Sequence, residues 1–94
     1  MAVVKDMAMT LEDFLRGLPS AMTGLDYRVN GHSVEAGTPE RRLSIVIEPQ
    51  PPRRLGGLLA VPRARVTITF EGYDPAAEAE FVERFDRAFQ RGGG

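Results

Sequence analysis

The residue of this chain best suited to acid–base chemistry near neutral pH is its single histidine, His32. Its neighbour Ser33 cannot serve as a nucleophile activated by it, because adjacent residues of a strand point to opposite faces. The chain has no cysteine, and one histidine without cysteine offers too few ligands for zinc. We therefore predict no enzymatic activity, no metal and no cofactor, and we expect His32 at the edge of the core.

Acidic residues gather near the end of the chain, but their spacing is typical of a solvated helix. Glu83 precedes Arg87 by four residues, and Glu80 precedes Arg84 in the same way. Pairs in this order stabilise a helix surface. No glycine-rich phosphate loop and no metalloprotease helix motif is present. These acids are interpreted as a structural helix face.

Arginine is the residue type here that is best placed for recognition. Residues 41–65 hold six arginines and one acid, Glu48, which is a net charge of +5, whereas residues 1–40 and residues 66–94 each carry −3. The guanidinium group forms paired hydrogen bonds with carboxylates and phosphates. A high arginine content is also typical of a GC-rich, bacterial-like composition. The segregation of the charge is therefore more informative than its amount.

Residues 49–63 combine this charge with proline and leucine. A connection of this length is uncommon in a compact domain and is often functional. Its four prolines lack backbone donors, so regular strand pairing is expected to fail near its base. We predict an arm that binds a protein partner or a second copy of the chain, through Arg53, Arg54, Leu55, Leu58, Leu59 and Arg63. The alternative is an arm folded back on the core edge, with its arginines solvated.

Nucleic acid is another class of partner for this arm, since a β-ribbon with arginines can enter a DNA groove. Two features argue against it. The net charge of the chain is −1, far from the basic balance of a nucleic-acid-binding domain. The presumed open face of the sheet also lacks aromatic side chains on which bases could stack.

The chain ends in Arg91-Gly92-Gly93-Gly94, which offers a different function. This end resembles the free diglycine tail of ubiquitin-like sulfur carriers and modifiers, whose terminal carboxylate is activated by adenylation. The resemblance covers about four residues and implies a carrier in which Gly93 and Gly94 are the functional residues. In that family a β-grasp fold ends in a strand that leads into the tail, whereas here a helix precedes it. We therefore predict a helix cap at Gly92 and a flexible tail over residues 92–94, and the carrier is the alternative function.

Hydrophobic periodicity predicts two helices. The chain is expected to form a single domain over residues 1–94, and residues 1–9 are expected to be flexible. Thr10 and Asp13 have the spacing of a capping box, so the first helix starts there, and Pro19 ends it. Asp74 caps the second helix, whose apolar face includes Phe81, Phe85 and Phe89.

Four strands are predicted between the helices. A turn at Asn30-Gly31 places Val29 opposite His32, and Ala36 is expected opposite Arg41. A turn at Gly56-Gly57 pairs the last two strands, with these expected partners: Leu43 with Phe70, Ile45 with Ile68, Ile47 with Val66, and Glu48 with Arg65.

The predicted fold class is α+β, a two-layer sandwich in which a four-stranded antiparallel meander of order 1-2-3-4 carries the N- and C-terminal helices on one face (αββββα). No apolar run is long enough to cross a bilayer, and the N-terminal residues lack the features of a signal peptide. We expect a cytoplasmic protein without membrane contact.

Overall fold

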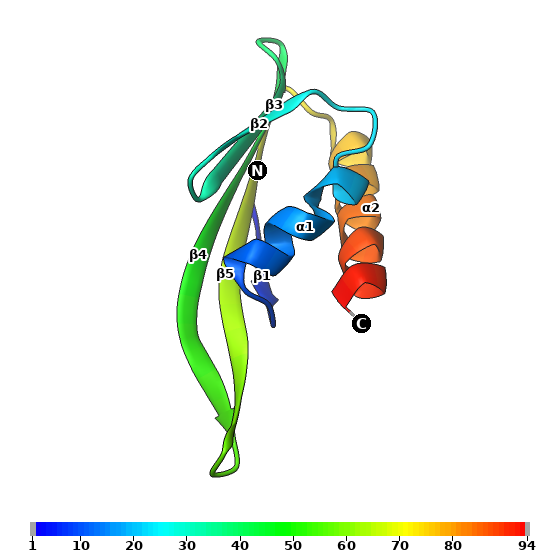
Figure 1. Cartoon of the computed structure of the whole chain (residues 1–94). Coiled ribbons are helices and arrows are strands. Elements are labelled where there is room, and N and C mark those ends of the chain that lie inside the picture. The colour runs from blue at the N-terminus through cyan, green and yellow to red at the C-terminus, as the bar shows by residue number, and fades with distance from the viewer. Residues whose placement is uncertain (1, 94) are drawn as a thin grey trace.

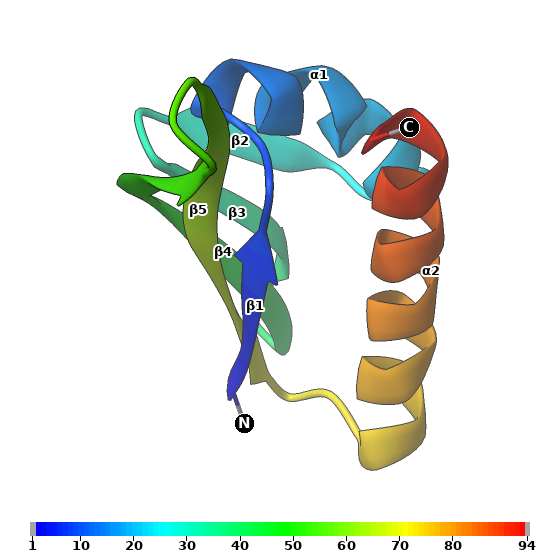
Figure 2. The ribbon, with the colours of Figure 1, turned by 90° about the horizontal axis from the view of Figure 1, so that it is seen from below.

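The computed structural model describes residues 2–93, with side chains up to residue 90. The elements in chain order are β1 Ala2–Met7, α1 Leu11–Ala21, β2 Tyr27–Asn30, β3 Ser33–Thr38, β4 Arg41–Leu55, β5 Leu59–Glu71 and α2 Pro75–Gly93. The strands form one antiparallel sheet of order β1-β5-β4-β3-β2, and both helices lie on the same side of it (Figures 1 and 2). The α+β sandwich is confirmed, with five strands and the order βαββββα.

The additional strand is β1, which corrects the prediction of a flexible segment over residues 1–9. β1 pairs with β5 from Ala2 opposite Thr69 to Met7 opposite Ala64. The sequence of β1 does not show the usual alternation of apolar and polar residues, because Lys5 occupies a position that faces the helices. The Lys5 ammonium lies 2.8 Å from the carboxylate of Asp86 on α2. A partner 81 positions away therefore makes a charged residue acceptable at an inward-facing site.

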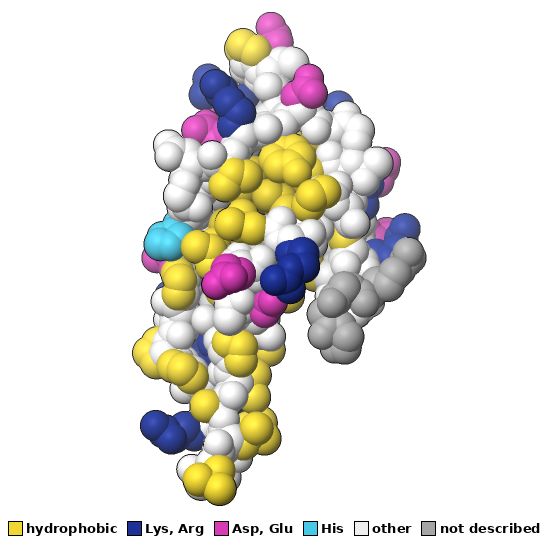
Figure 3. Space-filling model, in the orientation of Figure 1, with side chains coloured by type: hydrophobic (Ala, Val, Ile, Leu, Met, Phe, Trp, Pro, Cys, Tyr) yellow, Lys and Arg dark blue, Asp and Glu magenta, His cyan; other side chains and the backbone are white. Residues whose placement is uncertain are grey.

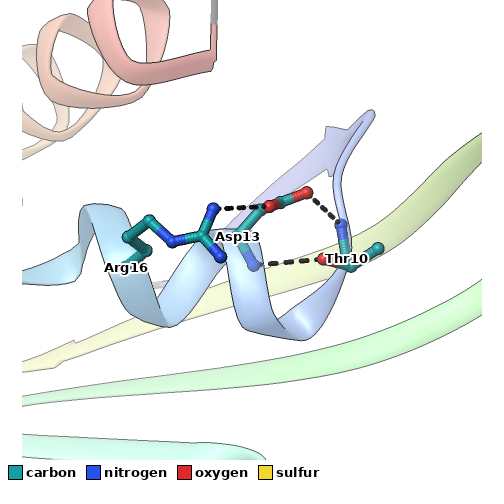
Figure 4. Close-up of polar contacts among 3 residues, drawn as sticks. All are labelled: Thr10, Asp13 and Arg16. Atoms are coloured by element: carbon teal, nitrogen blue, oxygen red, sulfur yellow. Dashed lines mark hydrogen bonds and ion pairs between the residues drawn. The ribbon is translucent and has the colours of Figure 1, made fainter.

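Helix α1 begins with the predicted capping box, drawn in Figure 4. The Asp13 backbone N–H donates to Thr10 Oγ1 at 3.1 Å, and the Thr10 N–H donates to Asp13 Oδ2 at 3.4 Å. Arg16 Nη1 donates to Asp13 Oδ1 at 3.2 Å. Hydrogen bonding to Thr10, aided by the Arg16 charge, holds the pKa of the Asp13 carboxyl below its ordinary value.

Helix α1 continues past Pro19, so the prediction that this proline ends the helix is wrong. The helix ends at Ala21, and the Met22 N–H donates to the Leu18 carbonyl at 2.9 Å. Pro19 lacks the N–H that would donate to the Leu15 carbonyl, so the helix loses one backbone hydrogen bond close to its end. The Thr23 hydroxyl donates to the carbonyls of Pro19 and Ser20 and so satisfies groups that the helix end leaves open.

The β2–β3 hairpin has a different register from the predicted one. Asn30 lies opposite Ser33, so the two-residue turn is Gly31-His32 rather than Asn30-Gly31. Only Gly31 has a positive φ, 61°, which is the pattern of a type II′ turn with glycine first. Ala36 is also shifted and faces Leu43 instead of Arg41. Both shifts are by two residues, so every inward side chain except His32 keeps its predicted face.

The pairing of β4 with β5 agrees with prediction at every expected partner. Leu43 lies opposite Phe70, Ile45 opposite Ile68, Ile47 opposite Val66, and Glu48 opposite Arg65. The inward side chains of these two strands, from Leu43 to Ile47 and from Ala64 to Phe70, are buried against the helices. This part of the sheet is the floor of the core.

Phenylalanines join the two helices above that floor. The rings of Phe14 on α1 and Phe89 on α2 stack with centroids 5.0 Å apart, and Phe85 is fully buried beside them. Gly17 permits this approach, because a Cβ at that position would lie 2.8 Å from Phe89. Helix α2 begins as predicted, since the Ala77 N–H donates to Asp74 Oδ1 at 2.7 Å. It continues to Gly93, beyond the predicted cap at Gly92.

Candidate interaction site on the β4–β5 arm

The predicted arm is a two-stranded ribbon that projects from the sheet. The neighbouring strands stop early, since β1 ends opposite Ala64 and β3 begins its pairing with β4 opposite Val46. Beyond these positions β4 and β5 pair only with each other, down to Leu55 opposite Leu59. The molecule measures 49 × 23 × 22 Å, and the ribbon extends beyond the other elements (Figure 1). The alternative arm, folded back on the core edge, is not the arrangement found. We call residues 49–63 the arm.

Strand pairing is interrupted at the base of the arm, as the prolines predict, but it then resumes. Gln50 lies opposite Arg63 and Arg53 lies opposite Val61, so β4 carries one extra residue at Pro51-Pro52. Such a bulge bends a strand and increases its twist. The expectation of lost pairing is therefore correct for Pro51, Pro52 and Pro62 and wrong for the rest of the arm.

Side-chain alternation along β5 divides the arm into two faces. Leu59, Val61 and Arg63 share a face with Thr67 and Thr69, which lie on the side of the sheet away from the helices. Because cross-strand partners share a face, Leu55 and Arg53 of β4 belong to this side as well. Arg54 lies opposite Ala60 and points to the other side. We call the side away from the helices the outer face.

The outer face exposes most of the large apolar side chains that lack cover. In the arm, Leu55 is 49 % exposed and Leu59 is 59 % exposed. On the sheet, Val4 is 61 % and Val46 is 41 % exposed, and both lie beside Thr67. Leu58, in the turn at the tip, is fully exposed. Figure 3 shows hydrophobic side chains along the projecting ribbon, with basic side chains and no acidic ones beside them.

The charges of the arm are almost all without a partner inside the molecule. Arg63 Nη2 lies 3.9 Å from Asp6 Oδ1, a loose and exposed ion pair that contributes little stability. Within residues 2–93, neither Arg53 nor Arg54 forms an ion pair, and the Glu48 carboxylate has none. The arm itself contains three arginines and no acid. These guanidinium groups are available to a partner.

The structure brings together some of the six predicted residues and separates others. Arg53, Leu55, Leu59 and Arg63 share the outer face, Leu58 lies at the tip, and Arg54 lies on the opposite side. Sequence reasoning missed the contribution of Val4, Val46 and Glu48 to the same face. The alternation of β4 held the signal for Val46 and Glu48, whereas β1 was not recognised as a strand.

The other residues considered for chemistry are not part of the arm. His32 is exposed in the β2–β3 turn, which corrects its expected position at the core edge, and its carbonyl accepts a hydrogen bond from the Ile47 N–H at 2.8 Å. Gly93 is the last residue of α2, and Gly94 lies outside the described residues. Within the described part of the chain, no group of three or more potential ligands could hold a metal ion.

A hollow of about 670 Å³ between α1 and α2 is an alternative site. Its lining includes three arginines, but each already has a partner. Arg16 pairs with Asp13, Arg87 pairs with Glu83 at 2.8 Å, and Arg84 donates to the Thr23 carbonyl at 3.1 Å. This hollow therefore offers no free guanidinium comparable to those of the arm.

Comparison with protein families, with curated proteins and with solved structures finds no match for this chain. Among residues 2–93, no helix has the length and apolar character that a membrane crossing requires.

Proposed function

We propose that this chain is a small non-enzymatic interaction module that uses its arm to hold a protein partner. The observation that supports the proposal most strongly is the exposure of Leu55, Leu58 and Leu59 at the end of a ribbon that carries three arginines. Exposed apolar groups bordered by charge typically mark an interface. Burying a leucine side chain contributes about 1.5–3 kcal/mol, so three of them would supply a substantial contact.

The arginines define the chemistry of the partner. Guanidinium groups at a protein interface favour carboxylates, which they can bind through two parallel hydrogen bonds. A partner surface with acidic side chains around an apolar patch would match the arm. A phosphate backbone would match the charge but not the leucines, and the arm has no aromatic side chain on which a base could stack. The features of the arm therefore favour a protein over a nucleic acid.

The proposal is tested by a triple variant, Arg53→Ser, Arg54→Ser and Leu58→Ser. All three side chains are exposed, so we expect an unchanged fold and the loss of partner binding. The measurement is quantitative affinity capture from native lysate, with light scattering to detect self-association. Binding that is the same for the triple variant and for wild type would refute the function.

A matched control changes two arginines and one apolar side chain at the other end of the sheet. Arg28, Arg42 and Val29 are also exposed, and none of them lies in the arm. Their replacement by serine should leave binding intact. A loss of binding in both triple variants would indicate a general effect of surface charge rather than a role of the arm.

A further inference from the structure

We infer that the partner of the outer face is a second copy of this chain, bound so that the arm of each copy crosses the sheet of the other. The inference rests on the proposed function, because it gives the arm a specific partner. It starts from the arrangement of apolar and charged residues along the outer face. That arrangement is symmetric about one cross-strand pair, Gln50 and Arg63.

The apolar groups lie at equal distances on the two sides of this central pair. Along β5, Thr67 and Leu59 are each four residues from Arg63, which is about 13 Å at the rise of a strand. Their β4 partners are Val46 on the sheet side and Leu55 on the arm side. The extra residue at Pro51-Pro52 is what makes the two distances on β4 equal. One apolar group is on the sheet and the other is on the arm.

On β4, the charged residues on the two sides of the same central pair have opposite signs. Two residues from Arg63 along β5 lie Arg65 and Val61, whose β4 partners are Glu48 and Arg53. Glu48 and Arg53 have no ion pair within residues 2–93. On β4, an acid thus lies on the sheet side at the same distance from the centre as a base on the arm side, whereas on β5 Arg65, which is exposed, and Val61 occupy the corresponding positions.

A two-fold axis through the central pair would bring these groups together. Two copies packed face to face and reversed in direction would place Glu48 of one against Arg53 of the other, twice by symmetry. Val46 would lie against Leu55 of the second copy. Sheets packed in this way lie about 10 Å apart and cross at about 30°, so side chains of both can interdigitate. The axis also brings the two Arg63 side chains near each other, each with Asp6 Oδ1 of its own chain 3.9 Å away.

Charge also favours a second copy over other partners. The arm has a net charge of +3, and the remainder of the chain therefore has −4, because the whole chain has −1. On the outer face, Asp6 and Glu48 are the acids that lie nearest the position that the arm of the other copy would occupy. Edge-to-edge pairing of two arms is disfavoured on the β4 side, where Pro49, Pro51 and Pro52 cannot donate backbone hydrogen bonds.

The inference is tested by charge reversal and rescue. Light scattering and sedimentation are measured from about 1 µM to about 1 mM for wild type, Arg53→Glu, Glu48→Arg and the double variant. We expect a wild-type dimer and a roughly 30-fold weaker association for each single variant, because each reversal disrupts two symmetric pairs. The double variant should recover to within about threefold of wild type. Circular dichroism and thermal unfolding confirm that each variant is folded.

Arg28→Glu is the matched control, because it makes the same charge change at an exposed arginine outside the arm. It should alter the dissociation constant by less than about threefold. The chain has no cysteine, so single cysteines can report the geometry. A short bis-maleimide should cross-link Gln50→Cys, at the axis, and should not cross-link Leu58→Cys, at the tip.

Wild type that is monomeric at all these concentrations would overturn the inference, while the proposed function would still be decided by the lysate capture. The inference also fails if the dimer resists both single reversals, if Arg28→Glu weakens it as much as Arg53→Glu does, or if only Leu58→Cys cross-links. Recovery of the dimer in the double variant would support it directly.

Discussion

Apolar side chains of β4 and β5 are buried in one region of the molecule and exposed in another. Under the helices, the inward side chains Leu43, Ile45 and Ile47 are at most 2 % exposed. In the arm, beyond the bulge at Pro51-Pro52, Leu55 and Leu59 lie on the outer face, which no helix covers, and stay about half exposed. Strand formation alone therefore does not bury apolar side chains in this protein. Burial requires the aromatic layer of α1 and α2.

The glycines of the two regions show the same contrast. Gly72, after β5, and Gly56, at the arm tip, have nearly equal positive φ angles, 77° and 79°. A Cβ at Gly72 would lie 1.9 Å from the Glu40 carbonyl oxygen, whereas a Cβ at Gly56 would meet no atom within 4 Å. The body is tightly packed around its turns and the arm is open to solvent. Stability is thus concentrated in the body, and the exposed arm is free to serve recognition.

The largest expected effect on stability comes from truncating a side chain in the aromatic core. Phe85→Ala should lower the free energy of unfolding by about 3–5 kcal/mol, because it removes a fully buried ring that contacts Phe14, Phe81 and Phe89. Urea unfolding followed by circular dichroism gives the value. If this variant is too unstable to measure, the smaller change Phe85→Leu should still shift the midpoint downward. A loss below about 1 kcal/mol for Phe85→Ala would contradict a core centred on this residue.

The second-largest expected effect is the difference in the free energy of unfolding between the variants Gly72→Ala and Gly56→Ala. Gly72→Ala should cost more than about 3 kcal/mol, because the backbone near Glu40 and Arg41 must move to admit the methyl group. Gly56→Ala should cost only about 1–2 kcal/mol, from left-handed strain alone. Thermal unfolding of both proteins measures the difference. Equal losses would show that the packing around the two turns does not differ as described.

The cap of α1 gives a smaller effect with a defined pH dependence. Thr10→Ala should lower stability by about 1 kcal/mol near neutral pH. The pKa of Asp13 is lower in the folded state than its ordinary value of 3.8, so its contribution is complete above that value. That contribution is lost as the pH falls through the folded-state pKa. Unfolding between pH 7 and pH 2 should therefore be less pH-dependent for Asp13→Asn than for wild type, and identical pH profiles would contradict the cap.

Variants in the arm should have the smallest effect on stability. Leu55→Ser, Leu58→Ser and Leu59→Ser should each change the free energy of unfolding by less than about 0.5 kcal/mol under conditions where the protein is monomeric. The same variants should alter association, where these leucines are expected to be buried. Urea unfolding at low protein concentration, compared with light scattering at high concentration, separates the two effects. A large loss of monomer stability would show that the arm belongs to the core.

The sequence predicted much of the fold and part of the site, for reasons that individual residues make clear. The β4–β5 register was predictable because apolar alternation on both strands agrees with the opposite charges of Glu48 and Arg65. The cap at Thr10 was predictable because its partner is only three residues away. The register of β2 with β3 was not, since a shift by two residues leaves the pattern of faces unchanged.

The amino-acid sequence by itself determined the helix starts, the long hairpin and the segregation of arginine, because these depend on neighbours or on short-range periodicity. Only the tertiary structure decided that residues 2–7 form an edge strand, because Lys5 is acceptable there through Asp86, far away in the chain. Only it decided that Val4, Val46, Leu55 and Leu59 share one uncovered surface. Which face a strand exposes depends on where helices pack, and that is set by contacts between distant parts of the chain.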